Sequence, residues 1–190
     1  RLLLFVPAAI WLLIADSEAA QMRMTSLDLL AERVTSQADE KDLILITHWQ
    51  SSITFDKYYK GKARWMTIPE LKSRKQQPYP EYKQKMTEPD ALRSVLEAIE
   101  ETLSKGGHVW LADAGDPAFN SEAAPFWKRP TAIPVAPFGP LKWQHPPYDY
   151  FWRNETLYFL SQHSARIVNV DGWGQYQIFP PERLALFQCS

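Results

Sequence analysis

The chain has 190 residues, a formal net charge of −1 and 45% hydrophobic residues. This length and hydrophobic content suit one ordinary domain with its own core and exclude a disordered chain, and the near-zero charge argues against nucleic-acid binding, which needs a basic surface. Eight Trp, eight Tyr and nine Phe indicate a surface or cleft lined with rings, or an interface near lipid headgroups.

An apolar segment without any charge, Leu2–Ala15, opens the sequence. It is shorter than the roughly 20 residues that span a bilayer, so it is read as the end of a transmembrane helix, the core of a signal peptide or a buried helix. The lack of a polar face favours lipid. We therefore expect residues 1–20 to end a transmembrane or membrane-associated helix, with membrane lipid as the partner of residues 2–15. Residues 21–190 would then form a soluble extracytoplasmic domain at the cell membrane.

Helical spacing and buried-strand composition alternate in the next part of the chain. Thr25 is placed to begin a helix, and Leu43–Thr47 is an apolar, β-branched run typical of a strand buried on both faces. A short helix ends at Gly61, and Arg64–Ile68 predicts a second strand. Residues 70–89 are polar and mixed, which predicts a long excursion with one short helix.

The clearest helix of the sequence begins at Glu88-Pro89 and ends at Gly106-Gly107. His108–Ala112 follows as a second central strand. Residues 115–147 are rich in proline and aromatic residues, and a stretch of this length without regular structure is usually functional. Asp149–His163 predicts a further helix with an aromatic face.

The last elements complete an α/β pattern. Arg166–Val170 predicts a third central strand, and Tyr176–Phe179 predicts an antiparallel partner, followed by Leu184–Phe187. We expect a three-layer, Rossmann-like open sheet that is mainly parallel, with a long proline- and aromatic-rich loop and an apolar N-terminal helix. Leu43–Thr47, His108–Ala112 and Arg166–Val170 should be neighbouring parallel strands.

Polar and aromatic residues follow the two central strands, or lie in the loop that leaves the second. Ligands of open parallel sheets bind beyond the carboxyl ends of the strands, so we expect these side chains to approach one another there. The candidate ligand-binding residues are His48, Trp49, Tyr59, Asp113, His145 and Tyr148. Rings beside a few polar groups suit a sugar or a lipid-linked headgroup. The alternative is that the rings only pack the loop onto the sheet.

Motifs for catalysis are missing from the sequence. It has no Gly-x-Ser-x-Gly elbow, no glycine-rich phosphate loop and no Cys/His set with metal-ligand spacing. His48 and Asp113 are residue types that act as base and orienter, but no nucleophile motif accompanies them. We assign no catalytic residue, metal ligand or cofactor to this chain.

Several strings along the chain carry a family resemblance. Together they resemble the C-terminal extracytoplasmic region of bacterial multi-spanning glycosyltransferases of the dolichyl-phosphate-mannose mannosyltransferase type, over most of residues 25–187. Their order and spacing carry the resemblance more than any single motif. The strings are Asp42–Leu45, Phe55–Gly61, Trp65–Pro69, Leu103–Leu111 and Tyr158–Leu160 followed by His163.

The resemblance implies an accessory, non-catalytic domain of a membrane glycosyltransferase that uses polyprenyl-phosphate-linked sugars. Some family members need a divalent metal, which would belong to the full-length enzyme, and the catalytic acid of the family lies in a loop that no position here matches. Ala112-Asp113 departs from the family, where a glycine often follows the strand. The alternatives are a membrane-anchored binding module without activity and a secreted α/β hydrolytic enzyme using His48 and Asp113. The number of hydrophobic spans in the full reading frame would separate the three.

Overall fold

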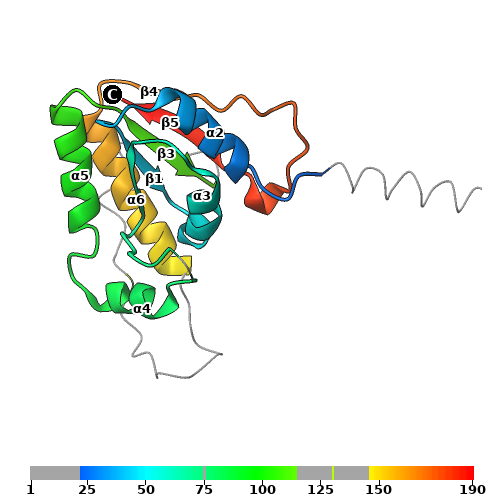
Figure 1. Ribbon diagram of the computed structural model, residues 1–190. Coiled ribbons are helices and arrows are strands. Elements are labelled where there is room, and N and C mark those ends of the chain that lie inside the picture. The colour runs from blue at the N-terminus through cyan, green and yellow to red at the C-terminus, as the bar shows by residue number, and fades with distance from the viewer. Residues whose placement is uncertain (1–21, 75, 115–129, 131–145) are drawn as a thin grey trace, which may run out of the picture.

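A five-stranded open sheet with helices on both faces organises the molecule (Figure 1). The computed structural model describes residues 22–74, 76–114, 130 and 146–190. The expected α/β class is confirmed, whereas the apolar N-terminal helix and most of the proline-rich loop lie outside the described residues. Within those ranges, no helix is both long and apolar enough to cross a bilayer.

Three parallel strands make up one side of the sheet. The strand order is β2-β1-β3-β5-β4. β1 (Leu43–Ile46) lies between β2 (Arg64–Thr67) and β3 (Val109–Asp113), and is parallel to both. β5 (Ala185–Cys189) runs antiparallel to β3 and to the edge strand β4 (Ile167–Asn169). The two central strands expected from the apolar runs are therefore direct neighbours.

The expected position of the third parallel strand is wrong. The run Arg166–Val170 contributes β4, but β5 separates it from β3, and β4 pairs antiparallel with β5. Burial gives the reason. The side chains of Leu186, Phe187 and Cys189 in β5 are buried, whereas those of β4 are half-buried or exposed. The more apolar strand takes the inner place, where both of its faces are covered.

The predicted strand Tyr176–Phe179 is also wrong. Only Ile178 is buried in this segment, and it makes a single parallel bridge with Arg23. The flanking residues Gln177 and Phe179 are exposed. A segment that buries one side chain cannot supply an inner strand of a sheet covered on both sides.

Helices cover the two faces of the sheet in unequal numbers. α2 (Leu27–Gln37) and α3 (Ser52–Tyr58) pack on one face. α4 (Tyr79–Thr87), α5 (Arg93–Ser104) and α6 (Pro146–His163) pack on the other. The predicted short helix within residues 70–89 is α4. The described residues also form two 3-10 turns, η1 (Trp49–Ser51) and η3 (Pro180–Glu182).

Alternation along the strands divides the core into two clusters. In β1, Leu43 and Leu45 pack against the layer of α4, α5 and α6, whereas Ile44 and Ile46 pack against α2 and α3. Successive side chains of a strand point to opposite faces, so a strand covered on both sides must be apolar throughout. The unbroken apolar run that predicted this strand is thus explained by its place in the sheet.

A buried carboxylate joins the starts of the two central strands. Asp42 accepts hydrogen bonds from the backbone N–H of His108 (2.8 Å), the indole Nε1 of Trp110 (3.0 Å) and the backbone N–H of Asp39 (3.0 Å). Burial of Asp42 acts to raise the pKa of its carboxyl group, but these hydrogen bonds outweigh burial and the pKa is lowered. The charged form of Asp42 therefore stabilises the fold.

We predict that Asp42→Ala lowers the free energy of unfolding by about 2–4 kcal/mol, because three donors lose a charged acceptor in the interior. The pKa of Asp42 in the folded chain lies below its ordinary value of 3.8. The stabilisation by ionised Asp42 is therefore complete above about pH 3.8, and it is lost as the pH falls through the pKa of the folded state. Urea denaturation at a series of pH values measures both effects. Asp39→Asn, at an exposed carboxylate of the same turn, is the matched control, and an equal loss in the control would contradict the prediction.

Candidate functional site

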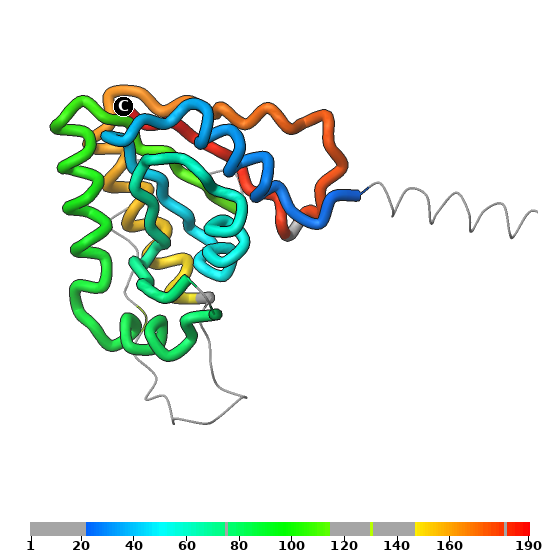
Figure 2. Tube along the Cα trace, in the orientation of Figure 1, coloured from blue at the N-terminus to red at the C-terminus, as the bar shows by residue number. Residues whose placement is uncertain are grey.

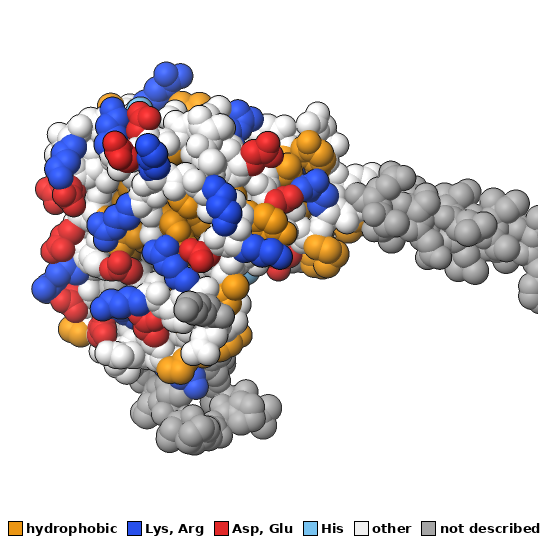
Figure 3. Space-filling model, in the orientation of Figure 1, with side chains coloured by type: hydrophobic (Ala, Val, Ile, Leu, Met, Phe, Trp, Pro, Cys, Tyr) orange, Lys and Arg blue, Asp and Glu red, His pale blue; other side chains and the backbone are white. Residues whose placement is uncertain are grey.

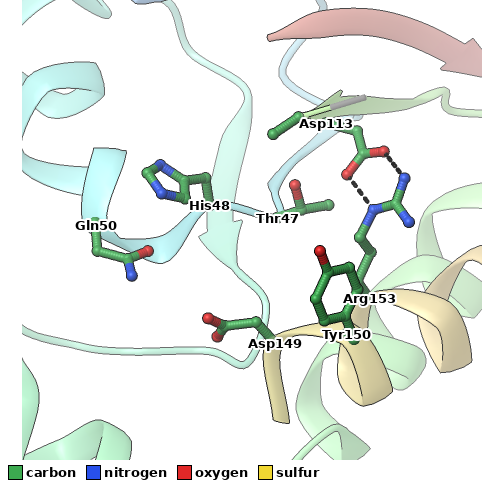
Figure 4. Close-up of a pocket in the computed structure, with 8 residues that line it drawn as sticks. Thr47, His48, Gln50, Asp113, Asp149, Tyr150 and Arg153 are labelled. Atoms are coloured by element: carbon green, nitrogen blue, oxygen red, sulfur yellow. Dashed lines mark hydrogen bonds and ion pairs between the residues drawn. The ribbon is translucent and has the colours of Figure 1, made fainter. Parts of the chain in front are cut away.

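A pocket opens beyond the carboxyl ends of β1 and β3. After β1 the chain passes to α3 on one face of the sheet, and α6, the next described helix after β3, packs on the other face. The strand order therefore reverses between these two neighbours, which is the place where open α/β sheets bind ligands. The pocket has a volume of about 270 Å³. Three parts of the chain line it, in order Thr47, His48 and Gln50; Asp113 and Ala114; Asp149, Tyr150 and Arg153 (Figure 4).

An ion pair closes one side of this pocket, which we call the switch-point pocket. Arg153 donates from Nε to Oδ1 of Asp113 (2.7 Å) and from Nη2 to Oδ2 (2.5 Å), as the dashed lines of Figure 4 show. The Asp113 side chain is fully buried, and that of Arg153 is 21% exposed. Burial acts to lower the pKa of the Arg153 guanidinium, but the hydrogen bonds and charge of Asp113 outweigh it and the pKa is raised. The guanidinium is thus held in its charged form.

His48 faces the pocket from the turn that follows β1. Its Nδ1 lies 2.7 Å from the hydroxyl oxygen of Ser51, three residues along in the next turn. Ser51 is buried and does not line the pocket. This contact fixes the orientation of the imidazole ring against a hydroxyl that does not line the pocket.

Asp149 is held by two aromatic side chains from beneath the pocket. Its Oδ1 accepts hydrogen bonds from the indole Nε1 of Trp49 (3.2 Å) and from the hydroxyl of Tyr82. The two rings stack with centroids 4.6 Å apart. Burial and the charge of Asp149 raise the pKa of the Tyr82 hydroxyl, which therefore stays protonated and donates. Trp49 thus serves the pocket by orienting a carboxylate rather than by offering its face.

The structure brings some of the candidate residues together and separates others. His48 and Asp113 line the switch-point pocket. Tyr148 is buried beside it, with its hydroxyl donating to the carbonyl of Pro130 (2.9 Å). Tyr59 lies on the opposite face of the sheet, where it stacks on Phe55 and donates to the carbonyl of Ala63. His145 lies outside the described residues.

Tyr59 is excluded from the pocket by the packing of the segment that contains it. Its ring lies 5.1 Å from that of Phe55 at an interplanar angle of 16°. A stacked, buried pair of this kind is ordinary core packing. In the sequence, Tyr59 follows a short helix, and the sequence does not show which face of the sheet that helix covers.

Three charged or aromatic residues of the pocket were missed by the sequence reasoning, and all come from the start of α6. Asp149 and Arg153 are four residues apart, so they lie on the same side of the helix. Tyr150 projects its ring at the pocket rim and is 64% exposed. The i, i+4 spacing of an acid and a base was a signal in the sequence, but it reads equally well as a surface pair until the helix is docked.

The charges of the pocket decide which ligands it suits. Asp113 and Asp149 contribute two negative charges and Arg153 contributes one positive charge, so with a neutral His48 the sum is −2 + 1 = −1. A phosphate would meet this excess of negative charge, whereas a neutral polyhydroxyl ligand would find acceptors, donors and one exposed ring. In the part of the chain that the structure describes, no three His, Cys, Asp or Glu side chains form a group able to hold a metal ion.

Comparison with known proteins gives no relative for this chain. The sequence matches no model of a protein family, and no curated protein and no solved structure matches it. Its function must therefore be inferred from the switch-point pocket and from the sequence.

We predict that the Asp113–Arg153 pair is strongly coupled. Arg153→Met should lower the free energy of unfolding by about 3–5 kcal/mol, because a buried carboxylate is left without its partner. The double variant Asp113→Asn/Arg153→Met should lose clearly less than the sum of the two single variants, since it removes the stranded charge. Guanidinium denaturation of the four proteins measures the coupling.

The exposed pair Arg93–Asp90 (2.6 Å) on the surface supplies the control for this cycle. Arg93→Met should cost less than about 1 kcal/mol, because water screens an exposed pair. Additive losses for Asp113 and Arg153, or an equal cost at Arg93, would show that the buried pair does not hold α6 against β3.

Proposed function

We propose that this chain is an accessory, non-catalytic extracytoplasmic domain of a membrane glycosyltransferase, and that the switch-point pocket binds the sugar unit of a polyprenyl-phosphate-linked donor or of the acceptor. The sequence resemblance supplies the class of enzyme. The observation that supports a sugar as the ligand is the pocket itself. It combines two carboxylates, a guanidinium, an imidazole and an exposed tyrosine ring at the point where the strand order reverses. We also propose that the sheet belongs to the Rossmann-like class of open α/β sheets.

A sugar fits this chemistry better than a phosphate. Its hydroxyl groups donate to carboxylates such as Asp149 and accept from donors such as Gln50, and the apolar face of its ring packs on an aromatic side chain such as Tyr150. The net charge of −1 favours a neutral group in the pocket. The phosphate and lipid of a linked sugar would accordingly remain outside it.

The hydrolytic alternative finds little support in the geometry. It needs His48 and Asp113 to act as base and orienter, but both oxygens of Asp113 are engaged by Arg153. Nδ1 of His48 contacts Ser51 instead, and that hydroxyl is buried outside the pocket. A nucleophile and base must reach the substrate together, so the proposal places the chemistry of the enzyme outside this chain.

We predict that Tyr150→Ala weakens sugar binding about 5-fold, which corresponds to the roughly 1 kcal/mol of an aromatic contact. Tyr150 is 64% exposed, so the substitution should leave the fold unchanged. Tyr158→Ala removes a second exposed tyrosine of α6 that does not line the pocket, and it should bind like the parent chain. Titration calorimetry of the full chain in detergent micelles measures the dissociation constants.

Three probes separate the parts of the ligand in this experiment. They are mannose linked to a ten-carbon prenyl phosphate, methyl α-mannopyranoside and the ten-carbon prenyl phosphate alone. The two compounds that contain sugar should bind, and the prenyl phosphate alone should not. Binding of the prenyl phosphate alone, or equal effects of the two tyrosine substitutions, would refute the assignment of the pocket to sugar.

A further inference from the structure

Four exposed apolar side chains gather where the described chain begins. Met24 is 69% exposed, and Met22, Tyr176 and Phe179 are each exposed by more than a third. We call these four residues the entry patch. Figure 3 shows apolar side chains grouped on the right-hand side of the view, and Figure 2 shows the first described residues beside the segment that precedes β5.

Backbone hydrogen bonds hold the entry patch together. The N–H of Arg23 donates to the carbonyl of Gln177 (2.8 Å), and the N–H of Phe179 donates to the carbonyl of Arg23 (2.9 Å). The Arg23 side chain pairs with Asp28 and lies over the Tyr176 ring, 5.2 Å from its centroid. The patch is therefore built from two segments far apart in the sequence and fixed to each other.

The alternation of extended chain explains why three of these side chains, those of Met22, Met24 and Phe179, face solvent. Ile178 turns inward and is buried, so its neighbours Gln177 and Phe179 turn outward. Met22 and Met24 likewise flank Arg23, whose guanidinium is held by Asp28. Single exposed apolar residues are common on protein surfaces, whereas a group of them beside charged residues is a candidate interaction surface.

We propose that the entry patch lies against the lipid surface of the membrane. The apolar segment Leu2–Ala15 precedes it in the sequence, and Ala15 and Met22 are seven residues apart. A chain fully extended over seven residues spans at most about 25 Å. If lipid holds residues 2–15, the entry patch is tethered within that distance of the bilayer. Methionine, tyrosine and phenylalanine side chains are suited to the interface between headgroups and acyl chains.

The entry patch and the switch-point pocket share one edge of the sheet. Ala185 at the start of β5 is paired with Asp113 at the end of β3, and Phe179 lies six residues before Ala185. The N–H of Leu184 donates to the Ser26 hydroxyl (2.8 Å), which fixes the start of the described chain at the same edge. Contact of the patch with lipid would thus keep the pocket near the membrane surface, where a lipid-linked sugar is presented.

The inference rests on the membrane attachment in the proposed function and not on the ligand of the pocket. Sugar binding is measured in micelles by calorimetry, and lipid contact is measured in vesicles by fluorescence. A failure of one is therefore distinguishable from a failure of the other.

Depth-dependent quenching in vesicles tests the proposal. The full chain is reconstituted into vesicles of phosphatidylcholine and phosphatidylglycerol (3:1 by mole, roughly the anionic content that attracts basic residues), with an NBD label on Met24→Cys. Ser104→Cys, at the exposed end of α5 on the opposite edge of the sheet, is the matched control. Cys189 is buried, and burial raises the pKa of its thiol to about 12, so it resists labelling.

Lipid contact predicts a clear difference between the two labels. A spin label near the headgroup end of the acyl chains should quench the label at Met24→Cys several-fold more than the label at Ser104→Cys, and the emission at residue 24 should shift to the blue. Equal, weak quenching at both positions in chains that co-sediment with vesicles would overturn the proposal. So would absence of vesicle binding, or a blue shift at residue 24 that appears without vesicles and grows with protein concentration, which would assign the patch to a second copy of the chain.

Discussion

The ion pair between Asp113 and Arg153 joins the end of the central strand β3 to helix α6 across the edge of the sheet. A carboxylate that is fully buried at a strand end is unstable without a fixed counter-charge, because the interior solvates it poorly. The guanidinium supplies that charge through two hydrogen bonds, and in doing so it fixes the first turns of α6. Asp149 and Tyr150, about one turn earlier, are thereby brought to the pocket. This contact sets their arrangement together with the hydrogen bonds that Trp49 and Tyr82 donate to Asp149.

The topology of the sheet places that contact at the carboxyl ends of the parallel strands, where open α/β sheets bind ligands. β1 and β3 are parallel neighbours, and the next described helices after them, α3 and α6, pack on opposite faces of the sheet, so a pocket opens beyond their carboxyl ends. Two polar groups of this pocket already have other partners. His48 contacts the hydroxyl of Ser51, and Asp149 accepts a hydrogen bond from Trp49. A pocket whose polar groups are oriented in advance loses little entropy when it binds a ligand. This preorganisation favours recognition, whereas the burial of Ser51 and the pairing of Asp113 argue against chemistry at the same place.

The sequence was sufficient for much of the fold because the relevant signals are local. The apolar runs of β1 and β3 report burial on both faces, and helical spacing reports α2 and α5. Strand order is not a local property. The insertion of β5 between β3 and β4 depends on which strand gains more from an inner position, and the periodicity of either strand does not record that comparison.

The candidate site was likewise predictable only where local signals set the position of a residue. His48 and Asp113 follow central strands directly, so their edge is set by strand direction alone. Tyr59 follows a helix, and its face depended on how α3 packs. Arg153 is separated from its partner Asp113 by forty residues, and only the docked helix shows that they meet. Residues positioned by a single element were thus accessible from sequence, and residues positioned by two were not.

The assignment of the switch-point pocket as a sugar site is tested most directly by nuclear magnetic resonance. The backbone amides of the ¹⁵N-labelled chain in micelles can be followed while methyl α-mannopyranoside is added. The largest shift changes are expected at residues 47–50, 113–114 and 149–153, which surround the pocket. Changes concentrated elsewhere, such as the groove between α5 and α6 lined by Leu96 and Phe159, or no changes at millimolar sugar, would contradict the account.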